Sequence, residues 1–493
     1  MPLLPHRLHS SNPTGGIAFM PLHEECGVFG IFNRGREHNA VHETYLALYA
    51  LQHRGQVSCG IAVRNAKTVD CITGMGTVPN VFTADKLAAL TENGTGDVAL
   101  GHVRYSAHGE EDEINNQPMV MSYARGSISV ADNGCLVNTA QLREKLQSEG
   151  AVFQTNSNAE LIVHCIARHR LCTENIETAI ANAMNEIEGA YSLVIMSPKK
   201  LVAVRDPKGF RPLCMGKLGE AYVIASESCA LQSIGAEFVR DIEPGEIVVI
   251  TKDDVYSNKT HCGNKTSLCI FEHVYTARPD SVIDGASVHR SRLNAGKFLA
   301  QEHPVEADVV IGAPDSGLDA AIGYAAESKI PYGIGLIKNR YIGRTFIQTT
   351  QSQRERSVQI KLNPLGNELE GKRVVLVDDS IVRGTTCAKL IKRLRTAGAK
   401  EVHMRISSPP FINPCYFGTD ISSKDKLIAC QLDIEGIRRL IGADTLGFLS
   451  LEALHKVADK SKVSFCDACF TGKYPIDISG PNYVDKFDYK IKK

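Results

Sequence analysis

The spacing of apolar and polar positions differs between the two halves of the chain. In the first 250 residues, short apolar runs that predict strands lie close together: residues 26–32, 128–130, 191–196, 201–204 and 222–225. Helical periodicity appears between these runs: residues 40–52, 140–148 and 160–169. Strands that follow one another before a helix intervenes are typical of stacked antiparallel sheets with helices outside.

Beyond residue 269 the pattern changes to a strand followed by a helix. Residues 309–313 precede a helical stretch at 318–327, and residues 373–377 precede one at 386–397, with Gly398 placed to end the helix. This alternation predicts a parallel sheet. The polar stretch 255–268 between the two patterns is the expected domain boundary.

A chain of 493 residues exceeds what one hydrophobic core usually supports, so two domains of roughly 200–250 residues are expected. The expected parts are a leader, two domains and a tail: residues 1–25, 26–260, 261–476 and 477–493. The leader is rich in His, Pro, Ser and Gly and lacks the apolar core of a secretory signal.

Composition narrows the class of protein. The 55 basic residues balance 55 acidic ones, so neither nucleic acid nor a membrane surface is an expected partner. No stretch approaches the ~20 apolar residues of a membrane span, and a soluble cytoplasmic protein is expected. Fifteen cysteines are too dilute for a disulfide scaffold, so they are expected to be buried thiols, nucleophiles or metal ligands.

Residues 374–386 carry the clearest chemistry. Four apolar residues predict a buried strand, two carboxylates stand at its end, and a short loop leads into a helix. Backbone N–H groups at the helix start can hold a phosphate, and the acids can take ribose hydroxyls or a hard cation. An ordinary strand-to-helix turn is the alternative, which the acid pair disfavours. The candidate residues are Asp378, Asp379, Ser380, Arg383, Gly384, Thr385 and Thr386.

This run resembles, along its thirteen residues, the phosphoribosyl diphosphate (PRPP) binding motif of phosphoribosyltransferases. In the first half, four segments resemble the class II glutamine amidotransferase domain of amidophosphoribosyltransferases: residues 24–30, 51–56, 101–106 and 133–134. Further segments resemble the same family in the second half: residues 269–281, 312–317 and 338–346. The resemblance spans about residues 23–476. It implies an N-terminal-nucleophile (αββα) glutaminase followed by an α/β type I phosphoribosyltransferase with a parallel sheet.

Cys26 is the implied nucleophile. A cysteine at a mature N-terminus has its own base, because an α-amino group titrates near ~8. Cys26 is not residue 1, and taken alone it reads as a core cysteine. The family resemblance implies that residues 1–25 are removed, whereas a start at Met20 would leave a shorter leader.

The resemblance also assigns the residues around the glutamine. Asn133 and the Gly134 N–H would form the oxyanion hole, and Arg104 would bind the substrate carboxylate. Asn158 stands where the family usually has an aspartate that pairs with the substrate ammonium. Asp132 and Cys135 also depart from the usual residues.

On the PRPP side, the resemblance assigns Mg²⁺ contacts to Ser316, Asp378 and Asp379. It places three cations, followed by the polar segment up to residue 361, on a loop that closes over the diphosphate: Lys338, Arg340 and Arg344.

Four cysteines need separate treatment. The Cys466-Asp467-Ala468-Cys469 spacing is weak evidence by itself, and zinc, a cluster and coincidence all compete. In an iron–sulfur subset of the family, however, [4Fe–4S] ligands occur in the sequence contexts that surround Cys269, Cys415, Cys466 and Cys469.

The implied reaction is the first step of de novo purine synthesis: glutamine, PRPP and water give 5-phosphoribosylamine, glutamate and diphosphate. Ammonia would pass through an interior channel, purine nucleotides would inhibit, and the assembly would be a homodimer or homotetramer. Two alternatives stay open. One is a transferase that uses free ammonia because its glutamine pocket has changed, and the other is a non-catalytic PRPP or nucleotide sensor.

Overall fold

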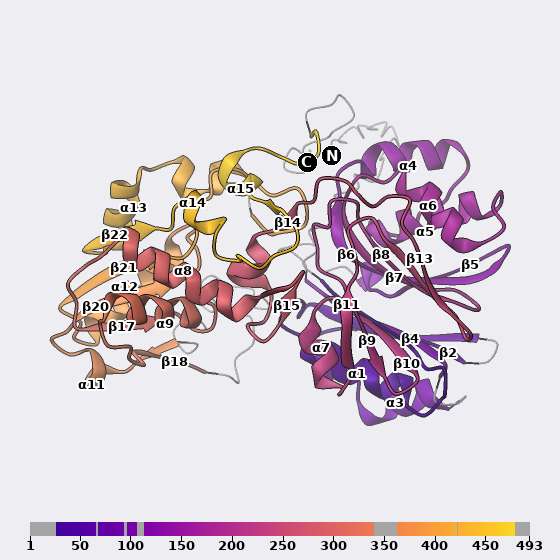
Figure 1. Ribbon diagram of the computed structural model, residues 1–493, viewed down its shortest axis with the longest axis horizontal. Helices are drawn as coiled ribbons and strands as arrows, with labels where there is room; N and C mark the ends of the chain where they lie inside the picture. Colours follow the sequence, from indigo (N-terminus) through magenta and orange to yellow (C-terminus); the bar gives the residue numbers. More distant parts are fainter. Residues whose placement is uncertain are drawn as a thin grey trace, which may run out of the picture.

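A computed structural model describes residues 26–65, 68–92, 96–105, 113–339, 362–421 and 423–478. Figure 1 shows two bodies side by side, with the first half of the chain on the right and the second on the left. Within the described ranges, none of the helices combines the length and the apolar character that a membrane span requires.

The first half contains two antiparallel sheets. The seven-stranded sheet has the order β11-β9-β10-β1-β4-β2-β3, and the six-stranded sheet the order β13-β12-β8-β7-β6-β5. The strands of the first sheet are β1 (Gly27–Phe32), β2 (Ser58–Asn65), β3 (Thr68–Met75), β4 (Val98–Arg104), β9 (Cys214–Leu218), β10 (Ala221–Ala225) and β11 (Glu237–Asp241). Those of the second are β5 (Met119–Tyr123), β6 (Gly126–Leu136), β7 (Gly189–Met196), β8 (Leu201–Arg205), β12 (Ile247–Ile250) and β13 (Val255–Asn258).

The two sheets pack face to face between helical layers. Val28 and Leu100 of the first sheet share a buried core with Ala131 and Val194 of the second. The outer face of each sheet buries its remaining apolar residues under helices. The first sheet is covered by α1 (Ala40–Ala50), α2 (Val78–Val81), α3 (Ala84–Thr91) and α7 (Ser228–Ser233), and the second by α4 (Thr139–Ser148), α5 (Asn158–Arg170) and α6 (Ile176–Met184).

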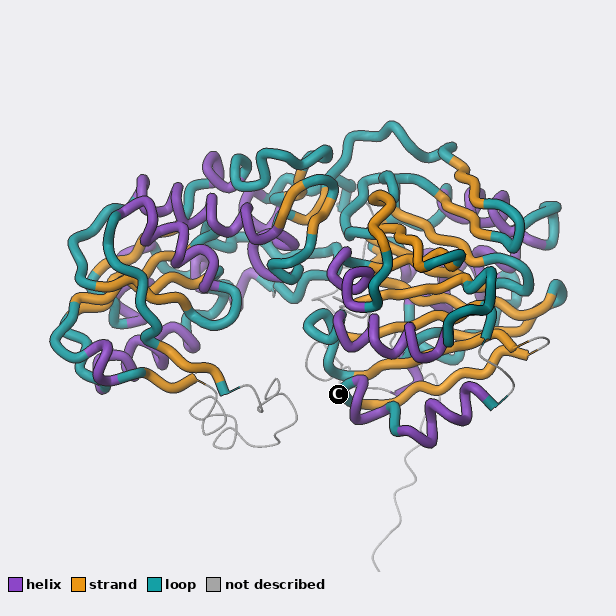
Figure 2. Tube along the Cα trace, turned by 60° about the horizontal axis from the view of Figure 1, so that its bottom comes forward, coloured by secondary structure: helices purple, strands orange, loops and turns teal. Residues whose placement is uncertain are grey.

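The second half is built on a parallel sheet with the strand order β17-β20-β21-β22. Successive residues of β20 point to opposite faces, so Val375 packs with α8 and α9 while Leu376 packs with α12 and α13. Figure 2 shows helices on both sides of these strands. The elements are β17 (Val309–Gly312), β20 (Arg373–Asp378), β21 (Glu401–Ile406), β22 (Thr445–Phe448), α8 (Val288–Glu302), α9 (Gly317–Ser328), α11 (Gly366–Leu369), α12 (Thr385–Thr396), α13 (Ile434–Ile441), α14 (Leu451–Leu454) and α15 (Ala468–Thr471).

Small strand pairs complete the second half. The parallel pair of β14 and β23 aligns Cys269 with Cys466 near the junction of the two halves (Figure 1). The pairs are β14 (Leu268–Cys269) with β23 (Phe465–Cys466), β15 (Val282–Ile283) with β16 (Ala286–Ser287), and β18 (Leu336–Lys338) with β19 (Leu362–Pro364). A π-helical turn, Glu272–Thr276, follows β14.

The predicted fold class is confirmed: an αββα half precedes an α/β half with a parallel sheet. The segment that holds Asn133 and Gly134 is longer than the short run expected at residues 128–130. Both residues lie inside β6 rather than in a turn, because β6 pairs with β7 over eight positions. The proposed boundary near residue 260 stays a prediction.

Candidate functional site

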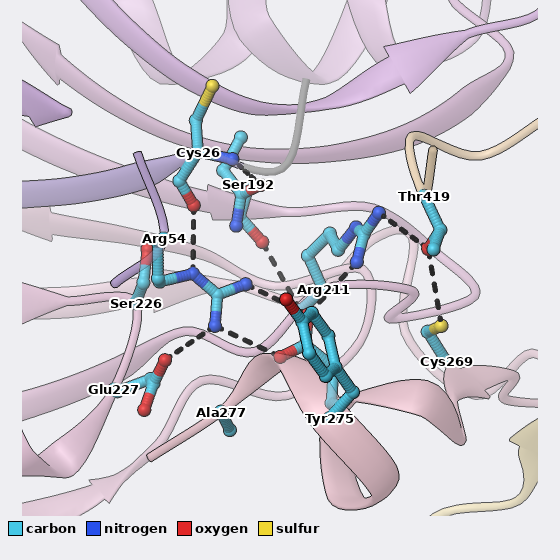
Figure 3. A network of polar contacts seen from close by, with 12 residues as sticks. Cys26, Arg54, Ser192, Arg211, Ser226, Glu227, Cys269, Tyr275, Ala277 and Thr419 are labelled. Carbon is cyan, nitrogen blue, oxygen red and sulfur yellow. Dashed lines mark hydrogen bonds and ion pairs between the residues drawn. The ribbon is translucent and has the colours of Figure 1, made fainter. Parts of the chain in front are cut away.

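Cys26 lies fully buried at the residue that precedes β1. Its backbone N–H donates to Asn133 Oδ1 at 3.2 Å, and its carbonyl accepts from Arg54 Nε at 2.9 Å (Figure 3). Its Sγ lies 4.0 Å from the carbonyl oxygen of Tyr105. The backbone of residue 26 is therefore fixed at both ends, and its thiol lies beside the end of β4.

The expected oxyanion residues lie next to this cysteine. Asn133 is fully buried, and its Nδ2 has no hydrogen-bond partner among the residues that the structure describes. Since its Oδ1 already accepts from the Cys26 N–H, the amide presents a donor close to Cys26. A Cβ on Gly134 would lie 2.0 Å from the carbonyl oxygen of Ala190, so the backbone approaches too closely for any other residue.

Arg104 and Asn158 are both buried and come from different layers. Arg104 ends β4, directly before Tyr105, whereas Asn158 begins α5. Arg143 holds the loop before α5 by donating to the carbonyls of Thr155 and Ser157, each at 3.0 Å. In the described part of the chain, Asn158 Nδ2 has no hydrogen-bond partner.

His102 supports the same strands from between the sheets. Its Nε2 lies 3.0 Å from the backbone carbonyl of Asp132 and must donate, because a carbonyl only accepts. Burial lowers the pKa of His102 to about 3, although this hydrogen bond opposes the shift. The imidazole is neutral and ties β4 to β6 beside Asn133.

The acid pair stands at the carboxyl end of β20, as predicted. Asp379 accepts from Ser316 Oγ and from Ser380 Oγ, each at 2.5 Å, and its own N–H donates to Asp378 Oδ1 at 2.9 Å. Burial, followed by the neighbouring Asp379, raises the pKa of Asp378 well above its ordinary value. Two crowded carboxylates with a hydroxyl are the oxygen ligands that a hard divalent cation prefers.

The loop after the acids opens onto a helix start. Gly384 has a φ of +74°, and α12 begins at the exposed Thr385 and Thr386, whose N–H groups lie in its first turn. Arg383 is exposed beside them. The geometry suits an anion at this helix start.

Other predicted PRPP residues divide into two groups. Lys338 ends β18 and forms an ion pair with Asp315, close to Ser316 in sequence. Arg340 and Arg344, together with the polar segment up to residue 361, lie outside the described residues. The predicted closing loop therefore stays a prediction.

The four singled-out cysteines line one small pocket at the junction of the two halves, with apolar and aromatic neighbours that include Phe210 and Phe417. None of the fifteen cysteines, all of which are described, forms a disulfide. Burial raises the pKa of Cys269 to about 11, and Arg211 opposes this shift. In the described ranges, no three His, Cys, Asp or Glu side chains are arranged to hold a metal ion.

A buried ion network was missed by the sequence analysis. Arg54 donates to Glu227 (Figure 3) and to Glu272, and Arg211 donates to the same Glu272. Burial lowers the pKa of Arg54, but Glu272 and Glu227 outweigh it, so the pKa stands above its usual range. Arg54 and Glu272 lie inside motifs that the sequence marked, yet nothing in one sequence pairs residues 218 positions apart.

Comparisons with known proteins cover both halves of the chain. Residues 102–233 match the family model described as a glutamine amidotransferase domain, and residues 288–407 match that of a phosphoribosyl transferase domain. A solved structure titled "glutamine phosphoribosylpyrophosphate (PRPP) amidotransferase" from Bacillus subtilis, complexed with ADP and GMP, is similar with a TM-score of 0.85. It has 45% sequence identity and covers 94% of this chain and 100% of that one.

Curated relatives are similar to this chain over nearly its full length. The amidophosphoribosyltransferase of Bacillus subtilis is 47% identical over 93% of this chain and 95% of its own length. That of Methanothermobacter thermautotrophicus is 44% identical over 95% of this chain and 97% of its own length. A chloroplastic one of Arabidopsis thaliana is 49% identical over 92% of this chain and 79% of its own length. The chain therefore belongs to the amidophosphoribosyltransferase family.

Proposed function

We propose that the chain carries out the family reaction at two sites, with Cys26 as the glutaminase nucleophile and the region of Asp378 and Asp379 as the PRPP site. Glutamine, PRPP and water would give 5-phosphoribosylamine, glutamate and diphosphate. The observation that carries this proposal is the pairing of Cys26 with Asn133: among the described residues, Asn133 Nδ2 has no hydrogen-bond partner, so it is a buried donor next to a buried thiol.

The glutaminase step follows from these positions. The Cys26 thiolate adds to the amide carbon of glutamine, and the oxyanion that forms accepts from Asn133 Nδ2 and from the Gly134 N–H. Two such donors stabilise the tetrahedral intermediate by several kcal/mol, because they are already oriented when the charge develops. Arg104 binds the α-carboxylate of the substrate bidentately. Removal of residues 1–25 would free the α-amine of Cys26, which then carries the proton to the departing ammonia.

At the second site, ammonia displaces diphosphate from the anomeric carbon of PRPP. Asp378 and Asp379 accept the ribose hydroxyls, and the start of α12 with Thr385 and Thr386 holds the 5-phosphate. Ser316 and the acid pair would hold Mg²⁺, which supplies positive charge to the diphosphate leaving group. Lys338, Arg340 and Arg344 would clamp the same group.

We propose that the four cysteines hold a [4Fe–4S] cluster. Such a cluster would offer a separate iron to each thiolate, so its ligands would surround a pocket instead of meeting at one point. Cys269, Cys415, Cys466 and Cys469 line one small pocket, and the Phe417 N–H donates to Cys415 Sγ at 3.4 Å. Iron and acid-labile sulfide analysis of anaerobically purified protein would distinguish the cluster from zinc.

Purine nucleotides are the proposed inhibitors, because the similar Bacillus subtilis structure is described as complexed with ADP and GMP. A homodimer or homotetramer is proposed from the same resemblance. Light scattering of the purified protein, with and without nucleotide, tests the assembly, and diphosphate release in the presence of each purine nucleotide tests the inhibition.

The central experiment compares diphosphate release driven by glutamine with release driven by ammonium, under anaerobic conditions. Cys26→Ala should abolish the glutamine-driven rate and leave the ammonium-driven rate. Loss of both rates would contradict the division into two sites. N-terminal sequencing of the same preparation shows whether the protein begins at Cys26.

The second candidate function is a transferase that depends on free ammonia. Asn158 favours it, because an amide in place of a carboxylate loses the ionic part of the contact with the substrate ammonium. In that case the unaltered chain would release diphosphate with ammonium but hardly with glutamine. A sensor without catalysis would bind PRPP and release no diphosphate with either nitrogen source.

A further inference from the structure

The buried ion network joins the nucleophile to the four-cysteine pocket. Arg54 is fully buried and donates through Nε to the Cys26 carbonyl, while its two terminal nitrogens reach Glu272 at 3.0 and 2.8 Å. Glu272 is also fully buried and accepts from Arg211 at 3.0 Å. Buried charges persist only where partners compensate them, so each member restricts the positions of the others.

Arg211 extends this network to the loop 415–421, which contains one of the four cysteines. Its second terminal nitrogen donates to the carbonyl of Phe417 and to Thr419 Oγ1, each at 3.2 Å. Thr419 Oγ1 in turn lies 3.8 Å from Cys269 Sγ (Figure 3). One arginine therefore contacts Glu272 on one side and the margin of the cysteine pocket on the other.

The same loop is fixed to the first half at two further points. Phe417 stacks on Phe210, with ring centroids 4.3 Å apart. Tyr105, the residue after Arg104, donates through its hydroxyl to Asp420 Oδ2 at 3.1 Å. The position of the loop is consequently coupled to the end of β4, where the Cys26 thiol lies.

The backbone of Arg211 also contacts the oxyanion strand. Ser192 Oγ donates to the Arg211 carbonyl at 3.2 Å, and Ser192 lies opposite Asn133 in the register of β6 and β7. Arg211 is thus connected to both partners of the proposed glutaminase step. It reaches Cys26 through Glu272 and Arg54, and it reaches Asn133 through Ser192.

We propose that Arg54, Glu272 and Arg211 form a positioning relay, through which loop 415–421 of the cysteine pocket sets the placement of the Cys26 thiol against its oxyanion hole. The inference rests on the proposed function of Cys26. None of the three relay residues touches the reacting atoms in this arrangement, so their effect is on geometry. Misplacement of a reacting group by about 1 Å costs about 100-fold in rate, and a partial loosening of the relay costs less.

Thr419→Val tests the relay with the least disturbance. Valine keeps the shape of threonine but removes the hydroxyl between Arg211 and Cys269. The glutamine-driven kcat should fall about tenfold with the KM for glutamine nearly unchanged, and the ammonium-driven rate and the iron content should equal those of the unaltered protein. Alkylation of Cys26 by iodoacetamide, followed by peptide mass spectrometry, should slow by a similar factor.

Arg211→Gln removes the charge and should give a larger fall of the same kind. If the two residues act as one unit, the double variant should match Arg211→Gln alone, because coupled residues are not additive. Asp97→Asn is the matched control. Asp97 accepts from the buried Arg64 at two points, each at 3.0 Å, in a bidentate ion pair of the first half that lies apart from Arg54, Glu272 and Arg211. The control should leave alkylation of Cys26 unchanged.

Three results would overturn the relay: an unchanged alkylation rate in Thr419→Val, an equal fall of the glutamine- and ammonium-driven rates, or additive effects in the double variant. Failure of the underlying function has a different signature. If Cys26→Ala retained glutamine-driven activity, the nucleophile itself would be wrong. If Cys26→Ala lost that activity while Thr419→Val resembled the unaltered protein, only the relay would be wrong.

Discussion

Replacement of Asn133 tests the glutaminase geometry most directly. The side chain has two separate tasks, since Oδ1 accepts from the Cys26 N–H and Nδ2 is the proposed oxyanion donor. Asn133→Ala removes both contacts. Asn133→Asp keeps an acceptor for residue 26 and removes only the donor, so the pair of variants separates the two tasks.

The expected magnitude follows from the cost of losing one oxyanion donor, about 3–4 kcal/mol, which is a 10²–10³-fold fall in kcat. The KM for glutamine should change little, because this contact strengthens only as the oxyanion forms. Asn133→Asp should be at least as slow as Asn133→Ala, since it places a negative charge beside a developing negative charge. Diphosphate release with ammonium should stay within about twofold of the unaltered protein, because that reaction bypasses Cys26.

The assay is steady-state glutamate release alongside ammonium-driven diphosphate release on the same preparation. Asn65→Ala is the control for general destabilisation, because Asn65 is also a buried strand asparagine of the first half but bonds to Asp70 and Leu90 away from Cys26. The reasoning would be refuted if Asn133→Asp kept normal glutaminase activity, or if Asn133→Ala lowered both nitrogen-dependent rates by the same factor.

Three further outcomes are expected. Asn158→Asp should lower the KM for glutamine about fivefold in steady-state assays, since a charge-assisted hydrogen bond exceeds a neutral one by about 1 kcal/mol; an unchanged KM would place the substrate ammonium elsewhere. Gly384→Ala should weaken PRPP binding measured by calorimetry, because the φ of residue 384 is +74° and the new Cβ would lie 2.8 Å from Ile428. Gly371→Ala is the control and should leave PRPP binding unchanged, because residue 371 has a similar φ of +72° but open space around its Cβ. Burial lowers the pKa of His102 to about 3, so below pH ~6.5 the unfolded chain binds a proton that the folded chain does not bind. Between pH 7 and pH 5 this difference should lower the free energy of unfolding, measured in urea, by about 2 kcal/mol. His102→Gln should not show this part of the decrease.

The regular elements could be predicted because their signals are local. The runs at 373–377 and 386–397 became β20 (Arg373–Asp378) and α12 (Thr385–Thr396), with Gly398 at a φ of +100° just after the helix. The extent of β6 could not be predicted from its own pattern. Its polar residues around Asn133 are buried against β7, and only that pairing makes the segment a strand.

The candidate site shows the same difference between features with a local signal in the sequence and features that depend on distant residues. Cys26, Asn133 and the acid pair could be proposed from the sequence because each lies within a short motif, and the structure brings Cys26 and Asn133 into contact. The contacts that hold Cys26 were not found, because Arg54 and Glu272 are 218 positions apart. Such a pair has no periodicity and no spacing rule; its existence follows from the burial of both charges, which is known only after folding.

The segment between residues 269 and 284 contacts both halves of the chain. On one side it is anchored to the first half by fully or nearly fully buried charges, through Glu272 with Arg54 and through Asp284 with Arg205. On the other side, Arg292 of α8 donates to the carbonyls of His273 and Ala277 at 3.0 and 2.7 Å. Because α8 packs on α9, which begins next to Ser316, we expect a displacement near Ser316 to be passed to the segment whose Glu272 holds Arg54. The expected coupling follows from sequence position. The carbonyls of His273 and Ala277, which accept from Arg292, and the carboxylate of Glu272, which accepts from Arg54, belong to one π-helical turn and the residue that follows it.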